Sequence, residues 1–155
     1  MNKILYHTIQ LHCATEHAFK MFTENEHVQK WLTEVADIEP KVGGKYELFW
    51  NPEDRENDST IGCTITAIEP NKFLAFEWKG PQHYKHFMND ADPLTHVVVF
   101  FISSRENKRS ETATEVHLIH SGWRSSPEWE EARLYFEKAW NDAFDRLRIY
   151  INKSH

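Results

Sequence analysis

The chain has 155 residues, of which 40% are hydrophobic and 27% charged, a composition that fits one globular domain and excludes a disordered chain. The formal net charge of -6 argues against a nucleic-acid partner, because an acidic surface repels phosphate backbones. The longest apolar run, residues 97–102, is far shorter than the roughly 20 residues of a membrane span, and no signal-peptide pattern opens the sequence. We therefore expect a cytoplasmic protein without a membrane span.

The first elements predicted along the chain are a strand and two short helices. Residues 4–12 alternate between polar and apolar side chains, which is typical of a half-buried strand. Thr15 can cap a helix that ends near Asn25, and a second helix follows at once. The apolar residues that recur at helical spacing in these two helices are Ala18, Phe19, Phe22, Val28, Trp31 and Leu32.

A run of strands follows the two helices. Pro40, Gly43 and Gly44 mark a turn, after which residues 45–50 alternate. Residues 51–59 are polar and predict a loop, whereas the segments 60–68 and 73–78 favour strands. The irregular stretch 80–93 predicts a long loop with one helical turn. Residues 94–103 and 112–121 then predict a hairpin around the charged loop 104–111.

The C-terminal segment, residues 126–152, predicts one long amphipathic helix that begins at Ser126. At 1.5 Å rise per residue it would be roughly 35 Å long, which is enough to cross the sheet of a small domain. Its apolar stripe comprises Trp129, Ala132, Phe136, Ala139, Trp140, Ala143, Phe144, Leu147 and Ile151.

The order of these elements predicts an α+β fold in a single domain, residues 1–155. Sequential antiparallel strands pair with one another, and the sheet has to bury one face against the long helix. The simplest arrangement is a curved antiparallel six-stranded sheet around the C-terminal helix.

Four short motifs occur in an order that resembles a known family. They are Trp31 and Leu32; Val42, Gly43, Gly44 and Lys45; Ile68, Glu69 and Pro70 before Leu74, Phe76, Glu77 and Trp78; and Ser121, Gly122 and Trp123. Together they resemble the homologues of the activator of the heat-shock-protein-ninety ATPase, a branch of the START-like or SRPBCC superfamily. The resemblance implies a helix-grip fold whose cavity, between sheet and helix, accepts apolar molecules.

The sequence departs from this family in two places. The family usually has Gly before the Trp of the final helix, where this chain has Ala139 before Trp140, so a close backbone approach is not expected there. The cochaperones that give the family its name also carry an N-terminal domain that takes part in binding the chaperone. We expect no such domain within these 155 residues.

Aromatic residues form 14% of the chain, including six Trp and ten Phe. Large rings fill a core without gaps only with difficulty, so rings on the inner faces of the sheet and helix are expected to wall a pocket. If Val116 and Leu118 face inward, His120 does too and becomes a polar anchor. The predicted ligand-binding side chains are Trp31, Tyr46, Leu48, Trp50, Phe76, Trp78, Phe101, Leu118, His120, Phe136, Trp140 and Phe144.

Other chemistry has little support in the sequence. His83 and His86 lie one helical turn apart, but neither a His-Glu-x-x-His motif nor a paired-cysteine motif accompanies them. Ser121 lacks a nucleophile elbow. The cysteines, Cys13 and Cys63, are expected to be reduced and buried. We therefore predict no metal site, no cofactor and no catalytic residue.

Three hypotheses about function remain open. The first is a non-catalytic binding protein for a small hydrophobic or aromatic molecule, acting as a monomer or homodimer. The second is a protein-interaction module, with a chaperone as one candidate partner and a patch in the loop 80–93 or on the outer sheet face. The third is a weak enzyme, which requires a titrating group such as His120 in the pocket.

Overall fold

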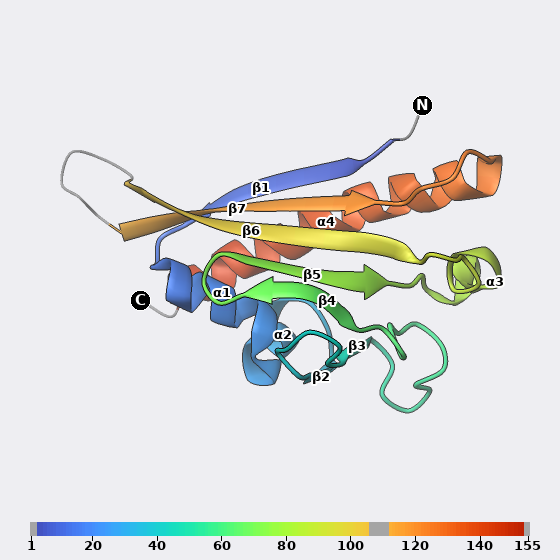
Figure 1. Ribbon diagram of the computed structural model, residues 1–155, viewed down its shortest axis with the longest axis horizontal. Helices are drawn as coiled ribbons and strands as arrows, with labels where there is room; N and C mark the ends of the chain where they lie inside the picture. The colour runs from blue at the N-terminus through green and yellow to red at the C-terminus, as the bar shows by residue number, and fades with distance from the viewer. Residues whose placement is uncertain (1–2, 106–111, 154–155) are drawn as a thin grey trace.

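The computed structural model describes residues 3–105 and 112–153, which fold into a mostly antiparallel sheet and a long C-terminal helix (Figure 1). The strands are β1 (Leu5–Leu11), β2 (Val35–Ile38), β3 (Tyr46–Phe49), β4 (Ile65–Glu69), β5 (Phe73–Trp78), β6 (Thr95–Arg105) and β7 (Thr112–Ser121). The helices are α1 (Thr15–Thr23), α2 (Asn25–Trp31), the 3-10 turn η1 (Gln82–Tyr84), α3 (Lys85–Met88) and α4 (Pro127–Lys153). Most of the predicted charged loop 104–111 lies outside the described residues.

The main sheet has the strand order β1-β7-β6-β5-β4, and every neighbouring pair is antiparallel. In Figure 1 the helix α4 passes behind this sheet. This arrangement agrees with the predicted α+β class and is consistent with a helix-grip fold.

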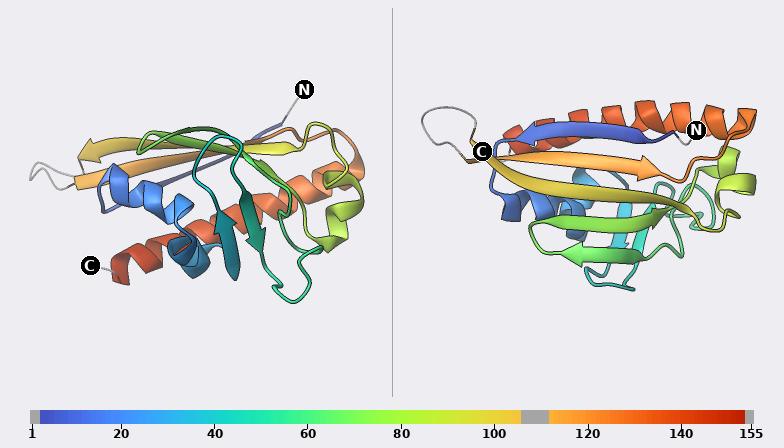
Figure 2. Two further views of the ribbon diagram at one scale, coloured as in Figure 1. Left: turned by 60° about the horizontal axis from the view of Figure 1, so that its bottom comes forward. Right: turned by 45° about the horizontal axis from the view of Figure 1, so that its top comes forward.

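The sheet differs from the expected six-stranded one, because β2 and β3 form a separate two-stranded sheet (Figure 2). The strand predicted at residues 60–68 starts only at Ile65. Before it, the chain contacts the region of β3 through the isolated bridges Lys45↔Thr64 and Phe49↔Ser59 and through single hydrogen bonds, such as that from the Tyr46 N–H to the Cys63 carbonyl (2.9 Å). Strand β2 was not expected, since it has only four residues and its sequence begins with two adjacent apolar residues, Val35 and Ala36. The continuous ladder therefore breaks between β3 and β4.

The core lies between the inner face of the main sheet and α4. Strand β1 buries every second residue, which matches its predicted alternation. Helix α4 begins at Pro127, one residue after the predicted start at Ser126, whose Oγ accepts a hydrogen bond from the Trp129 N–H (3.2 Å). The buried residues of its stripe are Ala132, Phe136, Trp140, Ala143, Phe144, Leu147 and Ile151.

Two side chains fasten α2 to its neighbours. The Trp31 indole N–H donates to the Met21 carbonyl of α1 (2.8 Å), and the Arg146 Nε of α4 donates to the Trp31 carbonyl (2.9 Å). Because α2 ends at Trp31, the second bond satisfies a carbonyl at the helix C-terminus. These bonds hold α1 and α2 against the C-terminal half of α4.

Both cysteines are free and buried, and burial raises the pKa of Cys13 to about 11 and that of Cys63 to about 12. Neither thiol therefore has the character of an activated nucleophile. Across residues 3–105 and 112–153, none of the helices combines the length and apolar composition that crossing a membrane requires.

Candidate functional site

A cavity of about 240 Å³ lies between the middle of α4, the end of β5 and the segment that links β3 to β4. Leu32, at the C-terminal end of α2, also lines it. The cavity is therefore assembled from four parts of the chain, with the sheet side on one wall and the long helix on the other.

Four of the predicted aromatic residues meet at this cavity: Trp50, Trp78, Phe136 and Trp140. Trp78 lies at their centre, with ring centroids 5.1 Å from Trp140, 5.9 Å from Trp50 and 6.1 Å from Phe136. Trp50 is 40% exposed whereas Trp78 and Trp140 are each 2% exposed. Trp50 thus forms the solvent side of the site.

The other predicted side chains do not line this cavity. Their rings pack closely in the core instead: Tyr46 stacks on Phe76 at 3.8 Å, and Trp31 meets Phe22 edge-on at 4.8 Å. Edge-on and stacked contacts of this kind fill space that a ligand would need. The residues that the structure places in the core are Trp31, Tyr46, Leu48, Phe76, Phe101, Leu118, His120 and Phe144.

His120 faces inward as predicted but bonds entirely within the protein. Its Nδ1 accepts the Trp140 indole N–H (3.1 Å), and its Nε2 lies 3.1 Å from the Thr95 hydroxyl oxygen. Because an indole N–H can only donate, Nδ1 is the acceptor and the neutral ring carries its proton on Nε2. Burial, with smaller contributions from His96 and His7, lowers the pKa of His120 to about 3. It anchors Trp140 and is not placed to anchor a ligand.

Several polar residues at the cavity were missed by the sequence reading: Asn51, Asp58, Ser59, Lys79 and Arg146. Three of them belong to the segment 51–59, which the sequence indicates only as a polar loop. Arg146 lies on the face of α4 that the helical pattern assigns to solvent. Neither a polar loop nor a solvent-facing helix position distinguishes a residue of a cavity wall from one of an ordinary surface.

The indole N–H of Trp78 has no hydrogen-bond acceptor among the described protein atoms, although the residue lines the cavity. Buried Trp side chains usually donate this N–H to a partner. The Nε1 atom is inaccessible to water, so it does not face the open cavity. Trp78 therefore contributes ring carbons to the cavity wall.

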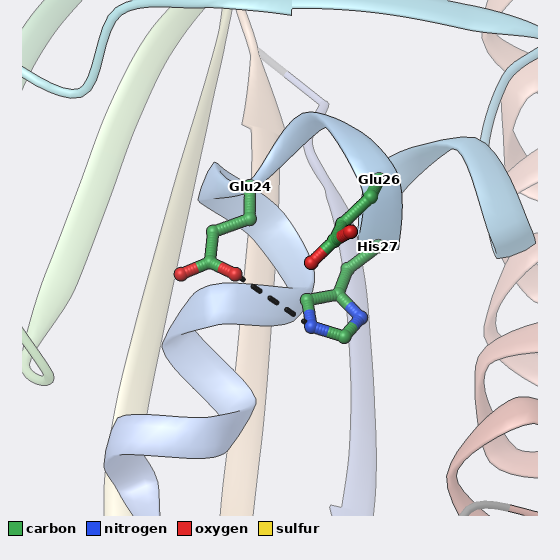
Figure 3. Close-up of side chains that lie close together, drawn as sticks. All are labelled: Glu24, Glu26 and His27. Carbon is green, nitrogen blue, oxygen red and sulfur yellow. Dashed lines mark ion pairs between the residues drawn. The ribbon is translucent and has the colours of Figure 1, made fainter.

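A different cluster, around α2, has the ligand types of a metal site. Glu24, Glu26 and His27 each offer a ligand atom, all within 4.8 Å of one another (Figure 3). The His27 Nε2 lies 3.6 Å from the Glu24 carboxylate, and its Nδ1 lies 2.7 Å from the Tyr150 hydroxyl. Exposed carboxylates commonly form such ion pairs with histidine, so we assign no metal to this cluster. His86, which the sequence offered as a possible metal ligand, has its Nε2 3.3 Å from the Glu128 carboxylate.

A second cavity, of about 340 Å³, lies at the N-terminal end of α4. Its three cations already have protein partners: Arg133 and Lys3 both bond Glu130, and Arg124 bonds the carbonyls of Gly122 and Pro93. The first cavity is therefore the better candidate for a binding site.

The sequence matches the family described as Activator of Hsp90 ATPase homolog 1-like protein over residues 12–152. The fold resembles that of protein MLL2253 from Mesorhizobium loti, with TM-score 0.72 and 20% identity over 99% of both chains. PFC0360w, an HSP90 activator from Plasmodium falciparum, aligns with TM-score 0.71 and 19% identity over 96% of both chains.

The Aha1 dimer from Colwellia psychrerythraea aligns with TM-score 0.67 and 16% identity, over 94% of this chain and 93% of that one. A comparison with curated protein sequences finds no significant match. Identities this low show a shared fold, and the family match covers most of the chain. The protein therefore belongs to the Activator of Hsp90 ATPase homolog 1-like family.

Proposed function

We propose that this protein binds a small hydrophobic or aromatic molecule in the cavity between the sheet and α4, without transforming it. The observation that carries the proposal is the set of four aromatic side chains, Trp50, Trp78, Phe136 and Trp140, around a cavity of about 240 Å³. An apolar cavity of about 150 Å³ is enough to hold benzene. The volume therefore suits a molecule of one or two rings.

Binding is favoured over catalysis by the chemistry of the lining. The acid–base candidate from the sequence, His120, is bonded in the core, and the Ser59 hydroxyl donates to the Arg55 carbonyl (2.7 Å). A nucleophile needs a base within hydrogen-bond reach. Among the described lining residues, no hydroxyl makes a hydrogen bond to such a base.

A cavity-filling variant tests the proposal. We expect 2-naphthol to shift the indole N–H signals of Trp50, Trp78 and Trp140 in an NMR titration and to raise the melting temperature by several degrees near saturation. Ala139→Leu adds volume to a cavity-lining position of α4, so it should abolish both effects. Ala139→Ser, at the same position with little added volume, should retain them.

The proposal fails if a panel of one- and two-ring aromatic compounds, at millimolar concentration, leaves the three indole signals unchanged. It also fails if Ala139→Leu keeps the wild-type affinity for 2-naphthol, since binding would then occur elsewhere. Melting curves of both variants establish that they are folded.

The outer face of the main sheet supports a second candidate function, a protein-interaction module. Tyr6 and Phe100 are 52% and 39% exposed, and both lie next to His117: Tyr6 stacks on its ring, and Phe100 is its cross-strand partner. The inner face is already covered by α4, so folding does not require this apolar patch. Its further exposed members are Ile4 and Ile102. The HSP90 activator and the dimer among the similar structures make a chaperone or a second copy the partners to test.

Charges placed on this patch should separate the two functions. We expect Tyr6→Glu combined with Phe100→Glu to weaken self-association, or binding to an Hsp90-type chaperone, by about tenfold or more, because each charge would have to be desolvated. Sedimentation velocity and surface plasmon resonance measure the two outcomes. Ala139→Leu is the control and should leave both unchanged. A wild-type protein that stays monomeric and does not bind the chaperone at about 100 µM contradicts this candidate.

A further inference from the structure

Resting on the proposed function, we propose that the molecule bound in this cavity is a small aromatic carboxylate. Its ring body would lie against the tryptophans, and its charged group would lie at Arg146. The argument rests on charge and on the fixed position of Arg146.

The cavity carries an excess of positive charge in a protein that is acidic as a whole. Its charged lining residues are Lys79, Arg146 and Asp58, whereas the chain has a net charge of -6. The Asp58 carboxylate keeps its charge while its Oδ1 accepts the Gln82 backbone N–H (2.8 Å), and the Lys79 amine donates to the Ile61 carbonyl. Two cations against one carboxylate leave the lining with one excess positive charge, which favours an anionic ligand.

Arg146 is held in place without being neutralised. Its Nε donates to the Trp31 carbonyl (2.9 Å), which fixes the guanidinium at the cavity. The two acidic residues nearest in sequence pair elsewhere: Asp145 with Arg148 and Asp142 with Lys138. No described carboxylate forms an ion pair with Arg146.

The free side of the guanidinium suits a carboxylate in particular. With Nε occupied, the terminal nitrogens keep N–H donors in a planar fork, and such a fork matches two carboxylate oxygens. The contrast with Arg133 is informative, because both Nε and a terminal nitrogen of Arg133 bond the Glu130 carboxylate. Arg146 has the same donors but no such protein partner among the described residues.

Trp78 supplies the apolar half of the site. Its ring lines the cavity and lies 5.1 Å from the ring of Trp140 and 5.9 Å from that of Trp50. Such rings offer a flat apolar surface to the ring of a ligand. A carboxylate attached to a ring therefore matches both the tryptophans and Arg146.

Matched probes of equal shape test the inference. We compare 2-naphthoate with 2-naphthamide by NMR titration and calorimetry, and we expect the carboxylate to bind at least about tenfold more tightly. Arg146→Gln should reduce this preference to about one, mainly by weakening 2-naphthoate. Arg148→Gln removes the same charge from the same helix at a residue outside the cavity lining and should preserve the preference.

The possible results separate this inference from the proposed function. Equal affinity for the two probes, with both blocked by Ala139→Leu, overturns the carboxylate while the binding function stands. A preference that survives Arg146→Gln also overturns it, because the charge would then be recognised elsewhere. Failure of both probes to perturb the indole signals overturns the carboxylate if 2-naphthol still shifts them, and it overturns the proposed function itself if the whole panel of aromatic compounds also fails. Arg146→Lys, which keeps the charge but not the fork, should show an intermediate preference.

Discussion

Replacing Gly44 by alanine should lower the free energy of unfolding by about 3 kcal/mol, at the upper end of the usual cost of overpacking. A Cβ at this position would lie 2.2 Å from the Glu39 carbonyl oxygen and 3.0 Å from that of Lys41. Both obstacles are backbone atoms, so no side-chain rotation relieves them. The Gly44 carbonyl also accepts the Ile65 N–H (2.9 Å), so a shift of the turn would disturb the start of β4.

The neighbouring glycine provides the control. Gly43 has a φ of 81°, but a Cβ there would meet nothing within 4 Å. Gly43→Ala should therefore lower the free energy of unfolding by about 1 kcal/mol, which is the cost of holding a non-glycine residue in the left-handed conformation. Urea denaturation of both variants measures the difference. An equal loss for the two variants would contradict the steric explanation and would mean that the turn relaxes.

The protein should lose about 2 kcal/mol of stability through His120 alone when the pH falls from 7 to 5. In the unfolded chain this histidine takes up a proton below its ordinary pKa of 6.5, whereas burial lowers its pKa in the folded protein to about 3. Between these values the unfolded state binds more protons, so a lower pH favours unfolding. Burial also lowers the pKa values of His7 and His96, and both add to the loss in the same direction.

A substitution isolates the contribution of His120. His120→Gln removes the titrating group. Between pH 7 and pH 5 the variant should therefore lose about 2 kcal/mol less stability than the wild type loses. The exposed His83→Gln is the control. Urea denaturation at both pH values gives the comparison, and NMR of the wild-type imidazole gives an independent one. A wild-type His120 that takes up a proton near pH 6 in the folded protein would contradict the prediction.

The elements that the sequence predicted well are those with a strong local pattern. Strand β1 alternates buried and exposed residues as expected, and α4 spans Pro127–Lys153 against an expected 126–152. In each case one apolar face repeats with the period of the element, so local spacing is enough. The two-stranded sheet was missed because β2 has four residues and is defined by its pairing with β3.

The candidate site was predictable only in part. Trp50, Trp78, Phe136 and Trp140 are recognisable as aromatic residues of inner faces, but Tyr46 and Phe76 have the same pattern and stack on each other in the core. Which rings leave a cavity depends on how neighbouring side chains fill the space between sheet and helix. Arg146 gives no signal in the sequence, since its role at the cavity follows from the position of the Trp31 carbonyl.

The sequence by itself determined the class of the fold, the inward stripe of α4 and the burial of His120, because hydrophobic periodicity fixes which side of an element leaves water. Only the tertiary structure decided where the aromatic packing stops and the cavity begins. It also decided that His120 bonds Trp140 and Thr95 and that Arg146 lies at the cavity wall. Those outcomes depend on distances between segments far apart in the chain, and no local pattern encodes such distances.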